Sequence, residues 1–426
     1  MRMRPLLVLW PPIVSVCTLT SGVAHAAGMD ELLTRALEND PEIAASVAQG
    51  DASGALVGQA RAGLLPRLSA TAAYTRNQFG AEVAFPGQDP VVITPVDQLE
   101  AIVRLDVPLV DVGGWSTLSA AVECRDAARS QLATEERVAL LEVVRAAWDV
   151  RAAARTRDAA AASVASGQAL AEVAAARFAA GTGSDADRLR AVSDLAGAQE
   201  ALAESAADLD AARRALAART GVDGAGYELA PRGVPTGDLA VSARERPEVS
   251  AARATLACRT ATRNALLAGI APDLSAFAQE RITNATGFAG QAATWAVGAQ
   301  VSWVPLDGGR RTSQLAEATA NQRLAEAQLA RREREALDAL ADSEARLGSA
   351  RIAVEAGQAR IAAAAAARSD AEARFAAGTG TSADVSAALA ETFDAEVNLA
   401  RAETRYAVAI EVLRVAAGQP LLLETP

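Results

Sequence analysis

Two long stretches of the chain scatter apolar residues through a background of Ala, Arg, Glu and Asp and contain no proline. They cover residues 115–180 and 310–377, and this composition favours uninterrupted α-helix. At a rise of about 1.5 Å per residue, each helix would be roughly 100 Å long. Residues 184–219 and 381–417 continue the pattern and predict helices that run back. The bulk of the chain is therefore expected to form two long helical hairpins.

The same phrase, ARFAAGTG, ends both long helices, at residues 176–183 and 373–380. Glycine adopts the left-handed conformation that terminates a helix at little cost, so Gly181 and Gly378 are suited to this position. Each phrase therefore predicts a hairpin tip. The two tips consist of three residues each, Gly181, Thr182, Gly183 and Gly378, Thr379, Gly380.

The residues after each tip predict the start of a returning helix. Ser184 and Thr381 are suited to cap its first turn. Asp187 and Asp384 follow within that turn, where the helix dipole favours a carboxylate. This structural role would by itself account for both aspartates.

Two other segments alternate apolar and polar residues with a period of two. They are Leu99–Val107 and Trp295–Trp303. Such alternation over about ten residues is typical of a transmembrane β-strand with one lipid face and one lumen face. Trp295 and Trp303 would lie near the two membrane interfaces. More weakly patterned partner strands are expected at 68–78 and 274–282, each joined to its partner by a polar loop.

Four strands do not close a barrel, because the smallest membrane barrels need about eight. An open sheet would leave unpaired backbone groups in lipid. The chain is therefore expected to assemble as a homotrimer, with about twelve strands in one barrel and the helices continuing as a tube. A soluble alternative stays open at this point, in which a small amphipathic sheet caps a coiled coil.

Further pairs of matching segments indicate that the chain is duplicated. LLPRLSA at residues 64–70 matches IAPDLSA at 270–276, and VPLVDVGG at 107–114 matches VPLDGG at 304–309. The first repeat is expected at residues 27–221, with a strand hairpin at about 66–108 and a helical hairpin at about 115–219. The second is expected at 222–426, with corresponding hairpins at about 272–305 and 310–417.

The N-terminus indicates export. Arg2 and Arg4 precede an apolar run that ends in Ala-His-Ala, so residues 1–26 are predicted to be a signal peptide. Lipidation of Cys17 is a less favoured alternative, because Val16 stands where a small residue is expected.

Removing the signal peptide also removes chemistry. The only histidine, His25, is lost with it, and the chain contains no lysine. His-based catalysis, His-ligated metals and a phosphate-binding GxxxxGK[ST] loop are thereby excluded. No cofactor or metal is expected, and the mature net charge of −13 argues against a nucleic-acid partner.

Two cysteines remain in the predicted mature chain, Cys124 and Cys258. They are far apart in sequence and neither has a neighbouring cysteine, which argues against a metal site. Two separately buried small residues are the favoured interpretation. A disulfide stays open, because both cysteines lie at similar distances from the landmarks of their own repeat.

The order of these duplicated segments resembles that of the TolC-like family of outer-membrane efflux channels. The resemblance rests on ALENDPEI, LLPRLSA, VPLVDVGG, ARFAAGTG and their second copies, and covers nearly the whole mature chain. It implies a mainly α-helical homotrimer with a twelve-stranded β-barrel in outer-membrane lipid and an α-helical barrel in the periplasm. It further implies that the chain forms the exit duct of a tripartite efflux or type I secretion system. Such a duct contacts a periplasmic adaptor and an inner-membrane transporter.

The resemblance also implies a periplasmic gate at the tips. Asp187 and Asp384 match gate aspartates of the family, and the tip glycines and threonines match the adaptor-docking surface. Phe375 stands where the family has a gate tyrosine, Gly380 where an arginine can join the closing network, and Ala387 where a second acidic residue can lie. The resemblance therefore does not indicate how the closed state is held.

A periplasmic coiled-coil scaffold is the alternative function. It would explain the helices and the repeat, but gives no reason for alternating strands of membrane length. Enzymatic activity is not expected, because acid–base work would fall to Asp, Glu and Tyr alone, and these form no recognisable constellation.

Overall fold

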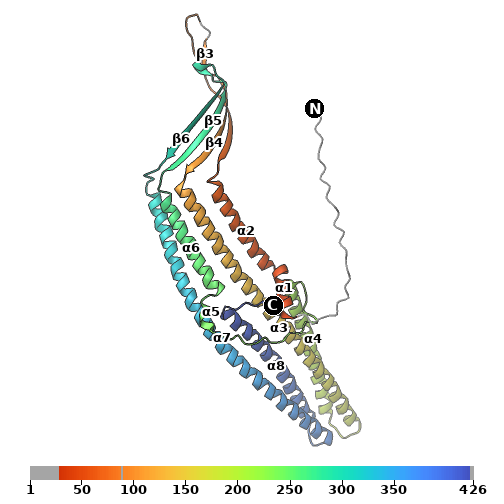
Figure 1. Cartoon of the computed structure of the whole chain (residues 1–426). Helices are drawn as coiled ribbons and strands as arrows, with labels where there is room; N and C mark the ends of the chain where they lie inside the picture. Colours follow the sequence, from red (N-terminus) through yellow and green to blue (C-terminus); the bar gives the residue numbers. More distant parts are fainter. Residues whose placement is uncertain (1–27, 88–89, 423–426) are drawn as a thin grey trace, which may run out of the picture.

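The computed structural model describes residues 28–87 and 90–422. The predicted signal peptide at 1–26, with Cys17 and His25, lies outside the described residues. The molecule is elongated, with a sheet at one end and two helical tips at the other (Figure 1). Residues 27–221 and 222–426 remain our proposed division into repeats.

The helices fall into two similar series, one in each half of the chain. Their bounds are Met29–Asn39 (α1), Pro41–Ala62 (α2), Val112–Ala179 (α3), Asp185–Thr220 (α4), Leu239–Ala243 (α5), Pro247–Ala268 (α6), Arg310–Ala377 (α7) and Ser382–Ala416 (α8). The two long helices α3 and α7 have 68 residues each. The predicted helical hairpins are thereby confirmed, and the second long helix matches its predicted bounds.

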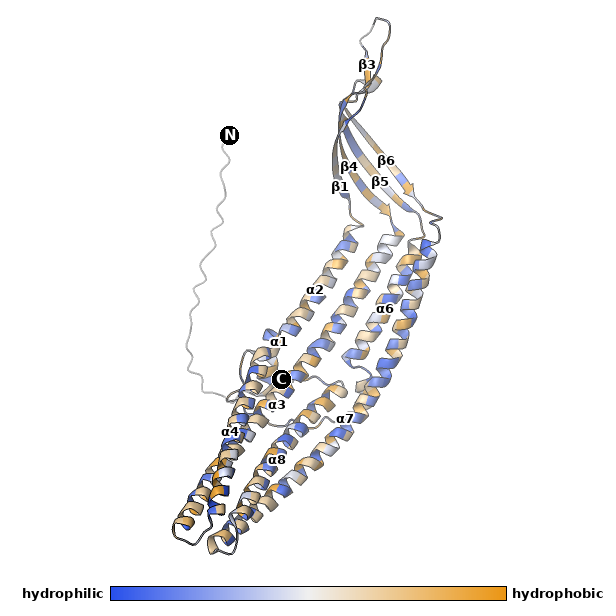
Figure 2. Cartoon of the chain, turned by 180° about the vertical axis from the view of Figure 1, so that it is seen from behind, coloured by the Kyte–Doolittle hydropathy of each residue, from blue (hydrophilic) through white to orange (hydrophobic). Residues whose placement is uncertain are grey.

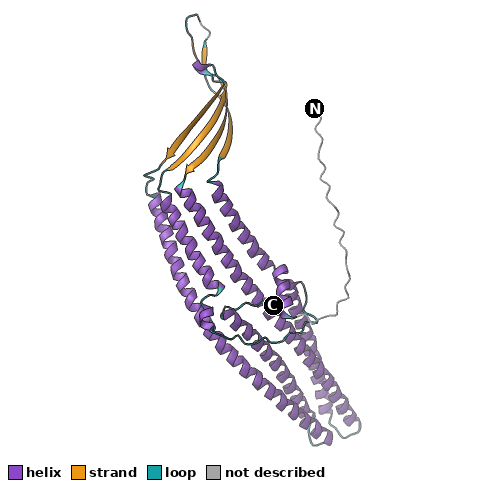
Figure 3. Ribbon diagram, in the orientation of Figure 1, coloured by secondary structure: helices purple, strands orange, loops and turns teal. Residues whose placement is uncertain are grey.

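Short and long helices alternate across the molecule. Near the sheet, α2 packs on α3, α3 on α6 and α6 on α7; near the tips, α4 packs on α3, α3 on α8 and α8 on α7. Helices α3 and α7 therefore run the whole length of the helical part. Helices α2 and α6 end midway, and α4 and α8 occupy the half near the tips (Figure 3).

The largest core lies midway, where α1 and the segments after α4 and α8 cover α3. Leu32, Leu33, Val143, Val144 and Leu216 are almost completely buried there. Elsewhere polar and apolar residues are intermixed along the helices (Figure 2). Within the described residues, no helix is both long enough and apolar enough to span a membrane.

Four of the described strands form one antiparallel sheet in the order β1-β4-β5-β6. Their bounds are Arg67–Arg76 (β1), Asp97–Val110 (β4), Asp273–Thr283 (β5) and Ala293–Ser302 (β6). The two predicted strand hairpins are confirmed, and β4 pairs with β5 to join them. The first connecting loop, predicted only as polar, contains two short strands, Ala81–Val83 (β2) and Val91–Thr94 (β3), which pair with each other.

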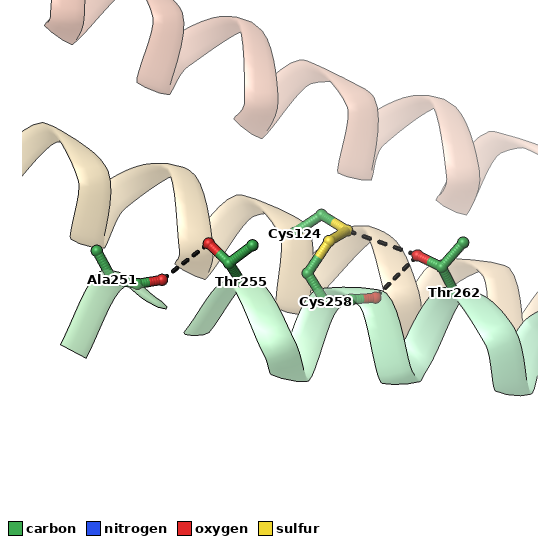
Figure 4. Close-up of a disulfide and its surroundings, with 5 residues drawn as sticks. All are labelled: Cys124, Ala251, Thr255, Cys258 and Thr262. Atoms are coloured by element: carbon green, nitrogen blue, oxygen red, sulfur yellow. Dashed lines mark hydrogen bonds between the residues drawn. A yellow bond between two sulfur atoms is a disulfide. The ribbon is translucent and has the colours of Figure 1, made fainter. Parts of the chain in front are cut away.

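The structure corrects the favoured interpretation of the cysteines. Cys124 of α3 and Cys258 of α6 form a disulfide with Cα atoms 4.6 Å apart (Figure 4). Thr262 lies beside the bridge and donates a hydrogen bond to the Cys258 carbonyl at 2.8 Å. The interpretation from sequence was wrong because the sequence pattern does not show that α3 packs closely against α6. This packing brings helices of different repeats side by side.

Removing this disulfide should lower thermal stability. It closes a loop with a sequence separation of 134 residues, for which loop-closure entropy predicts roughly 5 kcal/mol. The double variant Cys124→Ser/Cys258→Ser should therefore unfold at lower temperature than the wild type in the absence of reductant. Circular dichroism would measure both melting curves. Identical curves without reductant would show that the bridge contributes nothing.

Candidate functional site

Both tips turn by the same backbone arrangement. Gly181 and Gly378 have φ values of +73° and +76°, which confirms the predicted left-handed helix ends. The next two amides of each tip fold back onto one carbonyl: Thr182 and Gly183 donate to the Arg177 carbonyl at 2.9 and 3.1 Å. Thr379 and Gly380 donate to the Arg374 carbonyl at 3.0 and 3.1 Å. The otherwise unsatisfied carbonyls at the helix ends are thereby bonded.

The tip residues differ in their exposure and in the space around their Cα atoms. Gly181, Thr182, Gly378 and Thr379 are exposed at the end of the molecule, whereas Gly183 and Gly380 are half-buried. A Cβ atom added at Gly380 would lie 3.1 Å from the Arg374 Cβ. The tip therefore has little room for the arginine that the resemblance allows at this position.

Asp384 participates in a local cap at the start of α8. Its backbone amide donates to the Thr381 hydroxyl at 3.3 Å, and its carboxylate accepts from the Thr381 amide at 2.9 Å and hydroxyl at 2.8 Å. These bonds form a capping box. Led by the bond from the Thr381 amide, they lower the pKa of Asp384. The structural role foreseen for this aspartate is thus observed.

Asp187 caps its own helix and also joins the two tips. One carboxylate oxygen accepts from the Ser184 hydroxyl at 2.6 Å, and the other accepts from the Ser382 hydroxyl at 2.6 Å and amide at 3.4 Å. The bonds from Ser184 and then Ser382 lower the pKa of Asp187. Because a lowered pKa favours the folded state above the ordinary value of 3.8, this contribution is complete at neutral pH and is lost only in strong acid.

Phe375 lies between the tips and is only 6 % exposed. It packs in a small apolar cluster with Leu170, Ala174, Ala191, Val385 and Leu389. The Arg177 guanidinium lies 4.4 Å from the centre of the Phe375 ring and donates to the Ala376 carbonyl at 3.0 Å. A cation over an aromatic face is attracted by the ring, so Arg177 clamps the second tip to the first.

Sequence reasoning did not identify Arg177 and Ser382. Arg177 belongs to the repeated phrase, so it could have been singled out as a charge next to a helix end. Its contact with Phe375 could not, because that depends on which helices are neighbours. Ser382 differs from its repeat counterpart, Asp185, and that difference is the signal that was available.

The register places apolar residues on one face of the sheet. Residues that pair across strands share a face, and the rows that contain Val103 and Leu105 continue through β5 and β6. The side chains of this face are Leu68, Ala70, Ala72 and Tyr74; Leu99, Ala101, Val103, Leu105 and Val107; Leu274, Ala276, Ala278, Glu280 and Ile282; and Ala293, Trp295, Val297, Ala299 and Val301. Among these described residues Glu280 is the one carboxylate, and it pairs with Trp295.

The tryptophans occupy opposite ends of this sheet. Trp295 is 78 % exposed and lies two residues from the loop end of β6. Trp303 follows the helix end of β6, and its indole nitrogen donates to the Ile270 carbonyl at 3.1 Å. The opposite face carries the ion pairs Arg104–Asp106 at 2.8 Å and Arg281–Glu100 at 2.6 Å.

The sheet has one apolar and one polar face, as the strands of membrane barrels do, and long helical hairpins continue it. The family model of the outer membrane efflux protein matches residues 32–222 and 240–419. The chain therefore belongs to the outer membrane efflux protein family. It is located in the outer membrane, and its helical part extends into the periplasm.

Solved structures with the same fold are channels of low sequence identity. The outer-membrane channel OprN has 22% identity and a TM-score of 0.75, over 92% of this chain and 90% of that one. The CmeC channel of Campylobacter jejuni has 16% identity and a TM-score of 0.78, over 92% and 85%. The open MtrE channel of Neisseria gonorrhoeae has 18% identity and a TM-score of 0.74, over 92% and 89%. No curated protein matches the chain.

Family members are channels of tripartite efflux systems rather than enzymes. Such systems imply adaptor and inner-membrane partners.

Gly378, which ends α7, and Gly348, inside α7, should respond oppositely to alanine. Gly378→Ala places a Cβ on a left-handed residue and should destabilise the protein by about 1 kcal/mol. Gly348→Ala lies in the helix interior with open space around the new Cβ and should stabilise it by about 0.5–1 kcal/mol. Thermal denaturation would compare them, and a shift of the same sign in both would contradict this account of the tip.

Proposed function

We propose that the chain forms a homotrimeric channel in the outer membrane. The observation that carries this proposal is the sheet: one face is apolar, and its edge strands β1 and β6 have no partner strand within the described residues. Unpaired edges are not stable in lipid, whereas β6 of one copy can pair with β1 of the next. Three copies would close about twelve strands into a barrel.

The apolar face would contact lipid, and the ion-paired face would line the lumen. Trp295 and Trp303 would lie at the two interfaces, as tryptophans do in membrane barrels. Glu280 shares the row of Trp295, so its carboxylate would lie at the level of the headgroups rather than of the acyl chains.

The channel would act as the passive exit duct of a tripartite efflux or type I secretion system. Energy would come from the inner-membrane transporter, and a periplasmic adaptor would dock on the exposed tips. The tip surface consists of Gly181, Thr182, Gly183, Gly378, Thr379 and Gly380. A groove of about 530 Å³ between α3, α4 and α8 lies beside these tips and contains small residues such as Gly167 and Gly197.

Asp187, Asp384 and Phe375 would form the periplasmic gate. The Asp187–Ser382 bonds and the Phe375 cluster hold the two tips of one chain together. Three copies of Asp384 around the axis would make an electronegative collar that favours cations. Opening would separate the tips when adaptor contacts favour the open arrangement.

The first test is assembly in detergent. Light scattering, corrected for bound detergent, should give three times the mass of the mature chain, and planar bilayers containing this trimer should show single-channel conductance. A monomer that stays soluble without detergent would refute the channel and favour the periplasmic scaffold instead.

The two gate aspartates should have separable effects. Asp187→Ala removes the bonds between the tips and should raise the resting conductance by about tenfold, as expected for loss of a charged hydrogen bond. Asp384→Ala removes the collar and should lower cation selectivity more than it changes conductance. Reversal potentials in a salt gradient would measure selectivity.

Asp342→Ala is a matched control for these variants, because Asp342 is an exposed carboxylate of α7 that pairs with Arg346 away from the tips. It should leave conductance and selectivity unchanged. Wild-type behaviour in both gate variants would remove these aspartates from the gate.

A further inference from the structure

The repeat relates each residue of one tip to a residue of the other. The first tip consists of the ends of α3 and α4 at residues 170–192, and the second of the ends of α7 and α8 at residues 367–389. Equivalent residues are 197 positions apart, as for Arg177 and Arg374. Within one chain, one flank of the first tip packs on the second tip. In a closed ring, the free flank of the first tip would meet the second tip of a neighbouring copy.

That free flank carries apolar side chains that are largely exposed in one chain, although the Arg188 guanidinium lies 5.4 Å from the centre of the Phe178 ring. Phe178 is 44 % exposed and Val192 is 50 % exposed. Their equivalents in the second tip, Phe375 and Leu389, are 6 % and 9 % exposed because the first tip covers them. The same packing, repeated between copies, would bury Phe178 and Val192. The repeat thus identifies what covers this surface.

The interface between the tips of neighbouring copies, called the subunit joint below, cannot be identical to the interface between the two tips of one chain, called the joint within a chain. Ser382 donates to Asp187 within the chain, but the residue equivalent to Ser382 is Asp185, and the residue equivalent to Asp187 is Asp384. At the joint between copies, the position of the serine hydroxyl is therefore taken by a second carboxylate. Two carboxylates this close repel each other where a serine and a carboxylate would bond.

We propose that the second tip of a neighbouring copy covers Phe178 and Val192, and that this subunit joint is weaker than the joint within each chain. It pairs Asp384 with the partner subunit's Asp185 in place of a hydrogen bond. The proposal rests on the trimer proposed above. Opening then begins at the subunit joints, and the two tips of each chain separate only after that.

The charged side chains of this joint already have partners within their own chain. Asp185 is paired with Arg188 of its own helix at 2.7 Å, and Asp384 is held by Thr381. Arg374 is equivalent to the clamp Arg177, but it pairs with Asp370 at 2.7 Å, where the first tip has Val173. Within one chain Arg374 is thus bound to its own helix, so the clamp between copies competes with an existing ion pair.

Exchanging the residue that distinguishes the two joints tests the proposal. Asp185→Ser gives the subunit joint the hydroxyl that Ser382 supplies within the chain, and should lower open probability by about tenfold. Asp185→Ala removes the repulsion without adding a donor and should lower it less. Ser382→Ala weakens the other joint and should raise open probability.

Equal open probability for Asp185→Ser, Asp185→Ala and wild type would overturn the inference. An equal reduction by serine and alanine would overturn the hydrogen-bond equivalence. If the wild type forms no channel at all, the proposed function itself has failed, so that outcome is distinct.

A photo-crosslinking amino acid reports the docking surface independently of conductance. At position 178 it should capture a second copy and give a band of twice the chain mass. At the equivalent position 375 it should react mainly within its own chain, because Phe375 is buried there. Absence of the dimer band from position 178 in trimeric protein would show that another surface forms the joint.

Discussion

The free backbone groups along β1 and β6 constrain the rest of the structure. An edge strand carries donors and acceptors that water satisfies but a hydrocarbon layer does not. Only closure with further strands removes both edges, and the described residues of one chain contribute four strands to this sheet. The long helices follow from the same constraint, because α3 begins directly after β4 and α7 soon after β6. Each strand of the sheet therefore fixes the position of one helix in the frame below it.

Small residues make many of the contacts between the helices. Ala139, Ala147, Ala160 and Ala174 are all buried along α3, where neighbouring helices approach closely. Alanine suits such contacts because it loses no side-chain entropy and favours the helix. The disulfide between α3 and α6 fixes this packing near the sheet. Near the tips, the contact between the two hairpins of one chain relies on the bonds from Ser382 to Asp187, one cation over a ring and a few apolar side chains.

Much of this architecture could be predicted from sequence because it is encoded locally. Helix α7 was predicted to the residue, since neither proline nor a left-handed glycine interrupts it between Arg310 and Ala377. The strands could also be predicted locally, because apolar and polar residues alternate along them with a period of two. Contacts between distant segments could not be predicted in this way. The pairing of β4 with β5, the bridge between Cys124 and Cys258 and the clamp of Arg177 all depend on which helices and strands become neighbours.

The two tips show how duplication limits and enables function. Both copies kept the glycines, the caps and the aspartate of the turn, because these satisfy the backbone at a helix end whatever lies beside it. Some positions that face the other tip diverged: Asp185 and Ser382 are equivalent, as are Arg188 and Val385. A turn therefore needs the same residues in each copy, whereas the contact between two tips depends on which two residues meet across it. Because a ring built from duplicated chains alternates between two kinds of joint, divergence at one side of a pair is enough to make one kind separate first.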